Sequence, residues 1–381
     1  IPLKNSTICA FGSTRRKNST CEQDSSLQTL LAAQTEVVVI FGKAWPFHVT
    51  EIIKTTLEEN LLMIKETCAY LKEQGKRVFF DAEHFFTAYQ ENKDYALKTL
   101  QAALDGGAEV LCLCETKGGS MINQVQDAVK EVVELFGKKA QIGINTHNDS
   151  GLAVANSLVA VSEGATHVQG VLLGFGERTG NANLSTIIPN LQLKMGHECI
   201  PEENLAKLTP ICKQVAEIAN IKLNSQLPFV GANAFSHKAG MHIDAVLKNP
   251  KAYEHICPDQ LGNERKFLMS EVAGRSTIIK KIQKFAPSIQ KSDPIVKQII
   301  ERMKELEYEG YQFEGADGSF ELLVRKMLGQ YQPFFKLHYY NTIGSNPRPE
   351  EGVCCCEQIK SEVDGQIEVT AGEGDGPVNA L

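Results

Sequence analysis

Residues 142–191 read IGINTHNDSGLAVANSLVAVSEGATHVQGVLLGFGERTGNANLSTIIPNL, and this stretch decides the fold. Its pattern predicts a strand, a turn, a helix, a second strand, a glycine-rich loop and a second helix. Because residues i and i+2 of a strand point to the same face, Asn145 and His147 project together where the first strand ends. Folds of the α/β class place their chemistry at the carboxyl ends of parallel strands, so we predict the functional site here.

The same strand-then-helix unit recurs before this stretch. The predicted strands are mostly apolar rather than alternating, which is typical of parallel strands covered on both faces. Amphipathic helices are predicted between them, for example at residues 56–74 and 122–136, and a glycine follows each. Six strands are predicted in all, at residues 7–11, 37–41, 77–81, 109–114, 141–146 and 166–173.

Two architectures fit six consecutive units. One is an open, doubly wound sheet, and the other is an eight-stranded barrel without its first two units. The hydrophobic periodicity fits both. The chain starts with Ile1 and leads at once into an apolar strand, so we expect a TIM (β/α)8 barrel whose first two strands lie outside this chain. After Leu191 the repeat stops, and helical patterns follow at residues 196–223 and 294–310, with β-like runs at 334–340 and 366–369.

The composition narrows the class of protein. Hydrophobic residues make up 43% of the chain and charged residues 22%, which is ordinary for a globular protein. The net charge of −7 argues against a nucleic-acid partner. No apolar run approaches the roughly 20 residues that a membrane span needs. The first residues lack a signal-peptide pattern and the 11 cysteines are scattered, so we expect reduced thiols in the cytoplasm.

The leading candidate for chemistry is a metal site at His147, Asn145 and Asn181. Imidazole nitrogen and amide oxygen are ligands for a divalent metal ion of mixed N/O preference, although a structural histidine is the alternative. The loop from Gly174 to Asn181 opens a helix, and its backbone N–H groups could face an anionic ligand. A plain tight turn explains the same glycines.

Further candidates lie at other predicted strand ends. Asp81 and Glu83 share a face at the end of one strand, where a carboxyl group can serve as an acid or base. Thr116 follows the next strand and could hold a substrate carboxylate. Helix capping is the alternative for these residues. His242 and Tyr253 lie in a polar segment beyond the repeat, and His242 could transfer a proton near neutral pH.

Several long motifs give the chain a family resemblance. They include AFGSTRRK, FDAEHFF, THNDSGLAVANS, GERTGNANL, PNLQLKMG, HKAGMH and GYQFEGADGSFELL, and together they span nearly the whole chain. With these motifs the chain resembles the Claisen-condensing acyltransferases that include 2-isopropylmalate and homocitrate synthases. Within that family it looks closest to the citramalate synthase branch.

The resemblance implies a domain organisation and a reaction. A partial TIM-barrel catalytic domain would cover residues 1–200, a helical linker subdomain 201–310, and the start of a C-terminal α+β regulatory and dimerisation domain 311–381. Acetyl-CoA would condense with pyruvate to give (R)-citramalate and CoA, in isoleucine synthesis. A divalent ion, Mg, Mn or Zn, would act as a Lewis acid on the 2-oxo acid.

The resemblance also assigns roles to single residues. Those that match the family's site residues are His147, Asn181 and Asn145 for the metal ion, Glu83, His242 and Tyr253 for catalysis, Thr116, Asp81 and His48 for the substrate, and Gly174, Gly176, Glu177, Arg178 and Gly180 for the CoA co-substrate. The family contributes the histidine and the tyrosine from a neighbouring subunit, so we expect a homodimer.

The chain also departs from the family pattern. Asn145 stands where the family has a first metal histidine, and amide oxygen binds transition metals more weakly than imidazole nitrogen. Glu115 and Lys117 replace the usual Asp and Asn around Thr116. The family's first strand, which carries a metal-binding aspartate and an arginine, has no match in this chain, so we expect the chain alone to show little activity. Two alternatives stay open: a 2-isopropylmalate synthase, and a non-catalytic relative with a degraded metal site.

Overall fold

The computed structural model describes residues 3–238, 240–267, 275–313, 316–344 and 355–381. The chain forms two compact units. Unit 1 comprises Ile1–Ser236 and Lys251–Lys266, and unit 2 comprises His237–Pro250 and Phe267–Leu381. Within the described ranges, none of the helices combines the length and the apolar content that crossing a membrane requires.

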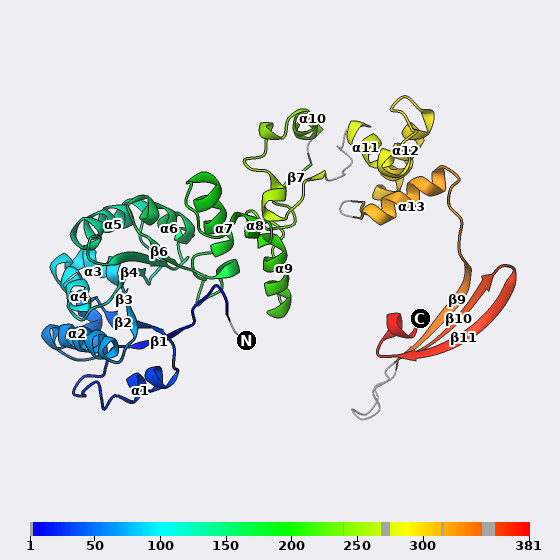
Figure 1. Ribbon diagram of the computed structural model, residues 1–381. Helices are drawn as coiled ribbons and strands as arrows, with labels where there is room; N and C mark the ends of the chain where they lie inside the picture. The colour runs from blue at the N-terminus through cyan, green and yellow to red at the C-terminus, as the bar shows by residue number, and fades with distance from the viewer. Residues whose placement is uncertain (1–2, 239, 268–274, 314–315, 345–354) are drawn as a thin grey trace. The chain divides into compact units, whose positions relative to one another are not determined.

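A six-stranded parallel sheet forms the centre of unit 1 (Figure 1). Its spatial order, β1-β2-β3-β4-β5-β6, is the order of the strands along the chain. A doubly wound sheet reverses its strand order at a switch point, whereas a (β/α) barrel adds each strand beside the previous one. The monotonic order therefore confirms the barrel type of fold. The strands are β1 (Cys9–Ser13), β2 (Val37–Lys43), β3 (Arg77–Glu83), β4 (Val110–Glu115), β5 (Gln141–Thr146) and β6 (His167–Gln169).

Helices connect consecutive strands, and their ends follow from the sequence. Thr56 caps α2 by accepting a hydrogen bond from the Glu59 N–H, and Asn92 caps α4 in the same way through Tyr95. The connecting elements are α1 (Ser25–Ala32), the π-helix η1 (His48–Ile52), α2 (Leu57–Glu73), α3 (Phe85–Glu91), α4 (Lys93–Asp105), α5 (Ile122–Phe136) and α6 (Ala153–Ser162).

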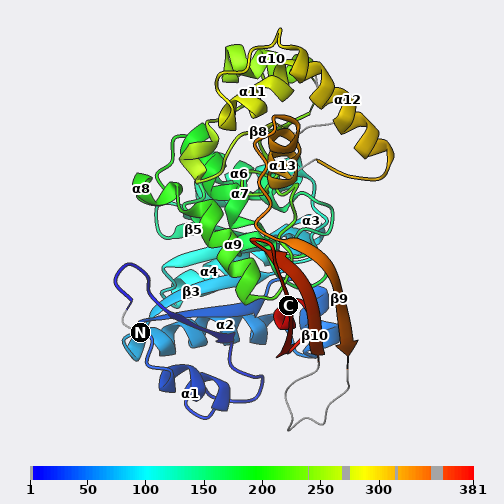
Figure 2. The same ribbon diagram turned by 90° about the vertical axis from the view of Figure 1, so that its right-hand side faces the viewer.

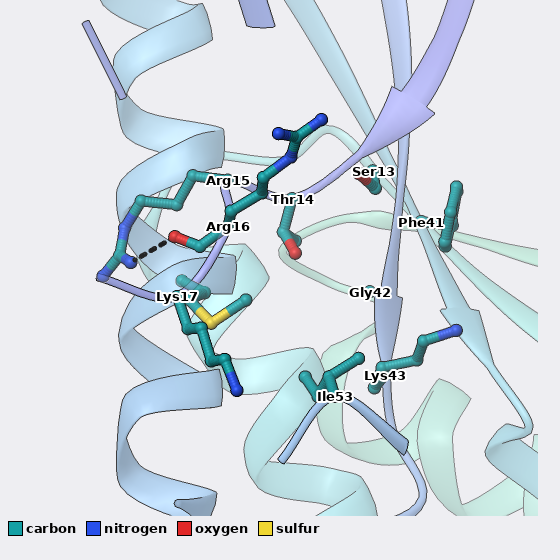
Figure 3. A pocket seen from close by; sticks show the side chains of 10 residues that line it. Ser13, Thr14, Arg15, Arg16, Lys17, Phe41, Gly42, Lys43 and Ile53 are labelled. Atoms are coloured by element: carbon teal, nitrogen blue, oxygen red, sulfur yellow. Dashed lines mark hydrogen bonds between the residues drawn. The ribbon is translucent and has the colours of Figure 1, made fainter. Parts of the chain in front are cut away.

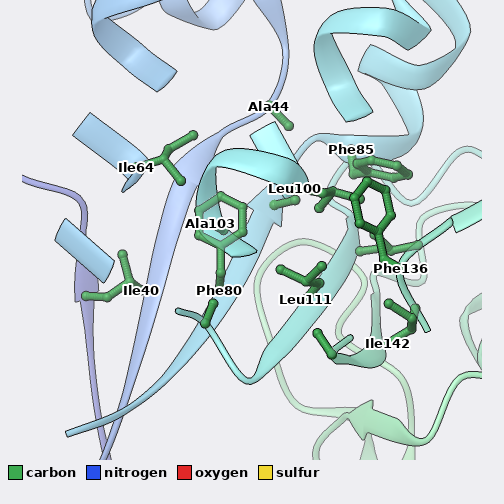
Figure 4. Packing of buried hydrophobic residues seen from close by; sticks show 14 of the residues in the cluster. Ile40, Ala44, Ile64, Phe80, Phe85, Leu100, Ala103, Leu111, Phe136 and Ile142 are labelled. Atoms are coloured by element: carbon green, nitrogen blue, oxygen red, sulfur yellow. The ribbon is translucent and has the colours of Figure 1, made fainter. Parts of the chain in front are cut away.

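The main hydrophobic core lies between the sheet and these helices. Figure 4 shows Phe80 and Leu111 of the strands packed against Ile64 of α2 and Phe136 of α5. Because side chains alternate along a strand, Val78, Phe80 and Ala82 point into this core. The intervening residues of β3, Asp81 and Glu83, therefore point to the opposite face. One face of the sheet holds this core, and the other carries apolar residues such as Val39, Phe41 and Phe79, with polar side chains at the carboxyl ends of the strands.

The elements after β6 complete unit 1, and β7, η4 and β8 each have one residue assigned to unit 2. Leu205, Leu208 and Cys212 belong to a second, smaller core. The elements between β6 and unit 2 are η2 (Leu172–Gly174), α7 (Leu184–Pro189), η3 (Asn190–Lys194), α8 (Glu202–Leu205), α9 (Leu208–Ile218) and β7 (Ser236–His237); η4 (Pro250–Ala252), η5 (Pro258–Leu261) and β8 (Lys266–Phe267) follow after α10.

Unit 2 contains a helical part and a three-stranded antiparallel sheet (Figure 2). The helices α11, α12 and α13 share a core that includes Ile282, Ile299 and Phe320. In the sheet, β10 lies between β9 and β11. The elements are α10 (Gly240–Lys248), α11 (Arg275–Phe285), α12 (Pro294–Tyr308), α13 (Asp317–Met327), β9 (Lys336–Gly344), β10 (Cys355–Val363), β11 (Gln366–Gly374) and α14 (Pro377–Ala380).

Several bounds differ from those predicted. Residues 122–136 and 141–146 match α5 and β5 at both ends. By contrast, β2 and β3 run two residues further than predicted, to Lys43 and Glu83, and β6 ends at Gln169 instead of Leu173. The helix α13 was not predicted, although its Phe320 and Val324 are spaced four residues apart and both lie in the core of unit 2.

We expect Ile64→Ala to lower the free energy of unfolding by about 2 to 5 kcal/mol, because Ile64 is fully buried and the substitution leaves a cavity. Urea denaturation of the purified chain measures the change. Ile218→Ala is the matched control in the same unit, since Ile218 is 79% exposed. Equal losses in the two variants would contradict the assignment of this core.

Candidate functional site

Polar side chains gather on the face of the sheet opposite the core, at the carboxyl ends of the strands. Lys43 of β2 is the register partner of Glu83 of β3. Asn145 of β5 is the register partner of Gln169 of β6. The register of the parallel strands therefore brings side chains from four separate units of the chain to one edge.

A hydrogen-bonded chain of three side chains crosses this face. The Gln169 Nε2 donates to Asp81 Oδ1 at 2.8 Å, and Asn145 Nδ2 donates to Gln169 Oε1 at 2.8 Å. Gln169 thus links Asp81 and Asn145, which are two of the predicted site residues. Asp81 is only 5% exposed, and burial raises the pKa of its carboxyl group to about 6 despite the hydrogen bond from Gln169.

Glu83 and Lys43 form an ion pair at the ends of β3 and β2. Both side chains are about one-fifth exposed, at 24% and 19% respectively. The Lys43 ammonium group also lies 5.4 Å from the centre of the Phe41 ring. The partly exposed carboxylate at the end of β3 lies on the polar face, where a general base has to meet its substrate.

A group of rings lies beside this ion pair. The ring centres of His48 and His84 are 4.3 Å apart, and Trp45 lies 5.1 Å from His48 and 5.5 Å from His84. Lys117 lies over the Trp45 ring at 4.0 Å. Burial lowers the pKa of His84 to about 4, with nearby cations adding to the effect, and burial also lowers the pKa of His48. Both imidazoles are therefore neutral at pH 7.

Thr116 connects the ring group to the metal-site candidates. Its hydroxyl oxygen accepts a hydrogen bond from the backbone N–H of His84 at 2.9 Å. Its carbonyl oxygen accepts one from Arg178 Nη2, also at 2.9 Å. His84 has φ +60°, a left-handed conformation between β3 and α3, so the Thr116 contact helps to fix a bend that L-residues rarely adopt.

Arg178 binds four acceptor atoms around His147. It makes a bidentate ion pair with Asp149, with distances of 2.8 and 2.9 Å. Its Nη2 lies 2.9 Å from His147 Nδ1. Because a guanidinium group only donates, Nδ1 must be the acceptor, and the neutral imidazole carries its proton on Nε2. Burial and the Arg178 charge lower the pKa of His147.

The glycine-rich loop folds back on itself. The N–H groups of Gly174, Gly180 and Asn181 all donate to backbone carbonyls within or next to the loop. A Cβ at Gly180 would lie 2.1 Å from the Gly174 oxygen, and the φ of +97° at Gly180 also favours glycine. This geometry supports the tight-turn interpretation, and the turn sets Asn181 beside His147 through an isolated β-bridge.

A cavity of about 430 Å³ opens at the carboxyl ends of β1 and β2 (Figure 3). Its walls combine apolar side chains with cationic ones, and Lys43 belongs both to this cavity and to the ion pair with Glu83. The lining residues are Ser13, Thr14, Arg15, Arg16, Lys17, Phe41, Gly42, Lys43, Ile53 and Met63.

The predicted site residues are distributed over both units. Those in the barrel sector all lie in unit 1, and Tyr253, 48% exposed, belongs to the same unit. His242 lies in α10 of unit 2. The catalytic roles of His242 and Tyr253 remain predictions.

Sequence reasoning missed several residues of the site. Lys43 and Gln169 were not predicted as site residues. Each ends its strand, two residues after another side chain on the same face of the sheet. Extending each predicted strand by alternation would have found Lys43. Nothing in the local sequence signals that Trp45 and Lys117 would meet, since they come from different units of the repeat.

The chain matches two known families in turn. Residues 4–215 match the HMGL-like family, and residues 229–310 match the family described as homocitrate synthase post-HMGL domain-like. The chain belongs to the HMGL-like family.

Curated relatives place it more narrowly within this family. The (R)-citramalate synthase of Aquifex aeolicus is 49% identical over all of this chain and 72% of that protein. The (R)-citramalate synthase of Sulfolobus acidocaldarius is 44% identical over all of this chain and 70% of that protein. The 2-isopropylmalate synthase of the same organism is 30% identical over 73% of this chain and 70% of that protein. The predicted citramalate synthase relationship is confirmed.

The HMGL-like family depends on a metal ion, and the predicted ligands fit one in their chemistry. Asn145 and Asn181 both use their amide N–H groups in hydrogen bonds within the protein, which leaves the amide oxygens as ligands. His147 adds an imidazole. Ligation through Nδ1 requires Arg178 to leave that atom, and ligation through Nε2 requires the proton to move to Nδ1.

We expect Asn145→His to raise the affinity for Zn²⁺ or Co²⁺ by about 10- to 100-fold, since imidazole nitrogen replaces an amide oxygen. Gln169 Oε1 already accepts a hydrogen bond from residue 145 and is placed to orient the new ring. Isothermal titration calorimetry measures the affinity. Asn341→His is the control, because Asn341 lies on β9 of unit 2 and is not among the predicted ligands. An unchanged affinity in Asn145→His would mean that residue 145 is no ligand.

The raised pKa of Asp81 predicts a pH dependence of stability. Between about pH 4 and pH 6 the folded protein holds this proton more tightly than the unfolded chain, so stability falls as the pH rises through that window. We expect Asp81→Asn to remove this fall and to raise the free energy of unfolding at pH 7 by up to about 3 kcal/mol. Urea denaturation at several pH values measures both effects, and Asp94→Asn on the exposed side of α4 is the control.

Proposed function

We propose that the protein condenses acetyl-CoA with pyruvate and releases (R)-citramalate and CoA. The observation that carries the proposal is the 49% identity to an (R)-citramalate synthase over the whole chain, against 30% to a 2-isopropylmalate synthase over part of it. The polar face at the carboxyl ends of β2–β6 holds a candidate base, candidate anchors for a carboxylate and candidate metal ligands for such a condensation.

Glu83 is the proposed base that takes a proton from the acetyl methyl group. Its carboxylate is paired with the Lys43 ammonium group, and its position at the end of β3 directs it to the polar face. The Lys43 ammonium group also lies where it can stabilise the negative charge that develops on the thioester oxygen when the enolate forms.

Thr116 and Lys117 are the proposed anchors of the 2-oxo acid carboxylate. The Thr116 hydroxyl accepts from the His84 N–H, so its own proton can be donated to a substrate oxygen. Lys117 supplies the positive charge beside it and is held by the Trp45 ring. When bound, a divalent ion would polarise the keto group of the substrate, and His147, Asn181 and Asn145 would hold it.

The cavity beside β1 and β2 is the proposed site of the acetyl-CoA arm. Phe41, Ile53 and Met63 give it an apolar wall that suits the pantetheine chain, and the cations Arg16 and Lys17 suit phosphate groups. Lys43 joins the cavity to Glu83, so a thioester seated there would present its methyl group near the base. This cavity supports CoA binding better than the glycine-rich loop, in which the N–H groups of Gly174, Gly180 and Asn181 already donate to backbone carbonyls.

The assembly and the compartment are also proposed. A homodimer would let His242 and Tyr253 complete the site of the other subunit, with His242 assisting proton transfer. A reducing, cytoplasmic environment fits the buried thiols Cys21, Cys68, Cys112, Cys114 and Cys212, none of which forms a disulfide.

A non-catalytic relative is the second candidate function, and Asn145 is the observation that favours it. A regulatory protein of this kind would bind pyruvate or acetyl-CoA without releasing CoA. Detection of CoA with a thiol reagent separates the two functions directly. Faster turnover with 2-oxoisovalerate than with pyruvate would instead favour a 2-isopropylmalate synthase.

We expect Glu83→Gln to lower kcat by about 10² to 10⁴-fold with pyruvate and acetyl-CoA, because the amide cannot accept the methyl proton. Steady-state CoA release measures kcat, and exchange of the acetyl methyl protons with solvent deuterium should fall in parallel. Glu73→Gln at the end of α2 is the matched control, since Glu73 lies on the surface. Unchanged proton exchange in Glu83→Gln would remove Glu83 from the role of base.

A further inference from the structure

Three potential metal ligands converge where the ring group meets the ion pair. Each of His48, Glu83 and His84 offers one potential ligand atom. Among the described residues, these three atoms lie within 4.8 Å of one another. The three residues come from two units of the repeat: His48 opens η1 after β2, while Glu83 ends β3 and His84 follows it. None of them belongs to the set formed by His147, Asn145 and Asn181.

One ring nitrogen of each histidine lacks a partner. The Nδ1 atoms of both His48 and His84 are buried and have no hydrogen-bond partner among the described residues. A buried polar atom without a partner is destabilising, so native proteins rarely keep two of them side by side. The rings are 4.3 Å apart at their centres and steeply inclined to each other, at 66°. Something that accepts lone pairs from both rings would satisfy them together.

We propose that His48, Glu83 and His84 bind a divalent transition-metal ion, through two imidazole nitrogens and one carboxylate oxygen. Imidazole favours Zn²⁺, Co²⁺, Ni²⁺ and Cu²⁺ over Mg²⁺, so the ion differs in kind from one held mostly by amide oxygens. Three protein ligands leave a fourth position open, as in zinc sites that bind water or substrate. The site shares Glu83 with the function proposed above, so an ion bound there would take this carboxylate from its role as base, but binding of the ion does not itself depend on that function.

The backbone around the ligands suits a fixed site. His84 sits in a left-handed bend whose N–H is tied to Thr116, and His48 is the first residue of a π-helical turn. Ligand atoms around a tetrahedral zinc ion lie roughly 3.3 Å apart, given bonds of about 2.0 to 2.1 Å. The three ligand atoms here lie at most 4.8 Å apart, and side-chain rotations are enough to bring them to the spacing around a zinc ion.

Two lysines face the site and oppose the ion. Lys43 pairs with the Glu83 carboxylate, and Lys117 lies over Trp45, where its charge acts on both histidines. A carboxylate has two oxygens, so Glu83 can bind the ion with one and keep Lys43 on the other. The repulsion lowers the affinity without removing the ligands, and Lys43→Met should therefore bind the ion more tightly than wild type.

Metal binding to the purified protein tests the proposal. After chelation and removal of metal, Co²⁺ is added and followed by its visible absorption bands and by calorimetry. His48→Phe keeps the ring packing against Trp45 but removes both nitrogens. His84→Asn retains a residue type that tolerates the left-handed backbone. His147→Phe disables the other metal set, and His197→Phe is the surface control.

We expect wild type and His147→Phe to bind Co²⁺ with the intense bands of a four-coordinate site. We expect His48→Phe and His84→Asn to bind Co²⁺ more weakly by on the order of a hundredfold or more. This loss exceeds the one expected when only a residue next to a metal ligand is changed. The absence of Co²⁺ binding in His147→Phe, or unchanged affinity in His48→Phe, would overturn the proposal. Circular dichroism checks that each variant folds. If His84→Asn does not fold, the affinity of His48→Phe for Co²⁺ tests the proposal by itself. CoA release is measured separately, so loss of the condensation activity leaves this result unaffected.

Discussion

The packing of helices against one face of the parallel sheet is the constraint on which the rest of unit 1 depends. Phe80, Leu111 and Ile142 point into this core with almost no exposure, and strand alternation then forces their neighbours onto the other face. A slip of one residue in any strand would exchange the two sets. The core therefore determines on which face of the sheet Asp81, Glu83 and Asn145 lie.

Arg178 organises the part of the site that lies outside the strands. Its guanidinium group ties the loop after β6 to Asp149, to the Thr116 carbonyl and to His147, which come from the ends of β4 and β5. The planar arginine side chain has five N–H donors, against three in lysine, so it can make the bidentate pair with Asp149 and still reach the other two acceptors. The loop is thus fixed by one cation, while its glycines allow the close backbone contacts that bring Asn181 to His147.

The sequence predicted the elements of the fold better than the contacts between side chains. Residues 122–136 and 141–146 were predicted to the residue, because their apolar patterns are local and a glycine ends the helix. The hydrophobic periodicity alone fits both a barrel and a doubly wound sheet, since strand order is not encoded in the period of a single strand. In the site, Asp81 and Asn145 were chosen from their positions, but Gln169, which joins them, was not. Such a contact between residues 88 positions apart follows from strand register and from no local pattern.

The chain from Asp81 through Gln169 to Asn145 has a direction. An ionised carboxylate can only accept, so it draws the N–H group of the Gln169 amide toward itself. The oxygen of the same amide then faces Asn145, so Asn145 donates its own N–H group to that oxygen. The amide oxygen of Asn145 is left over as a result. One negative charge at Asp81 thereby selects, two side chains away, which atom of Asn145 is exposed to a ligand.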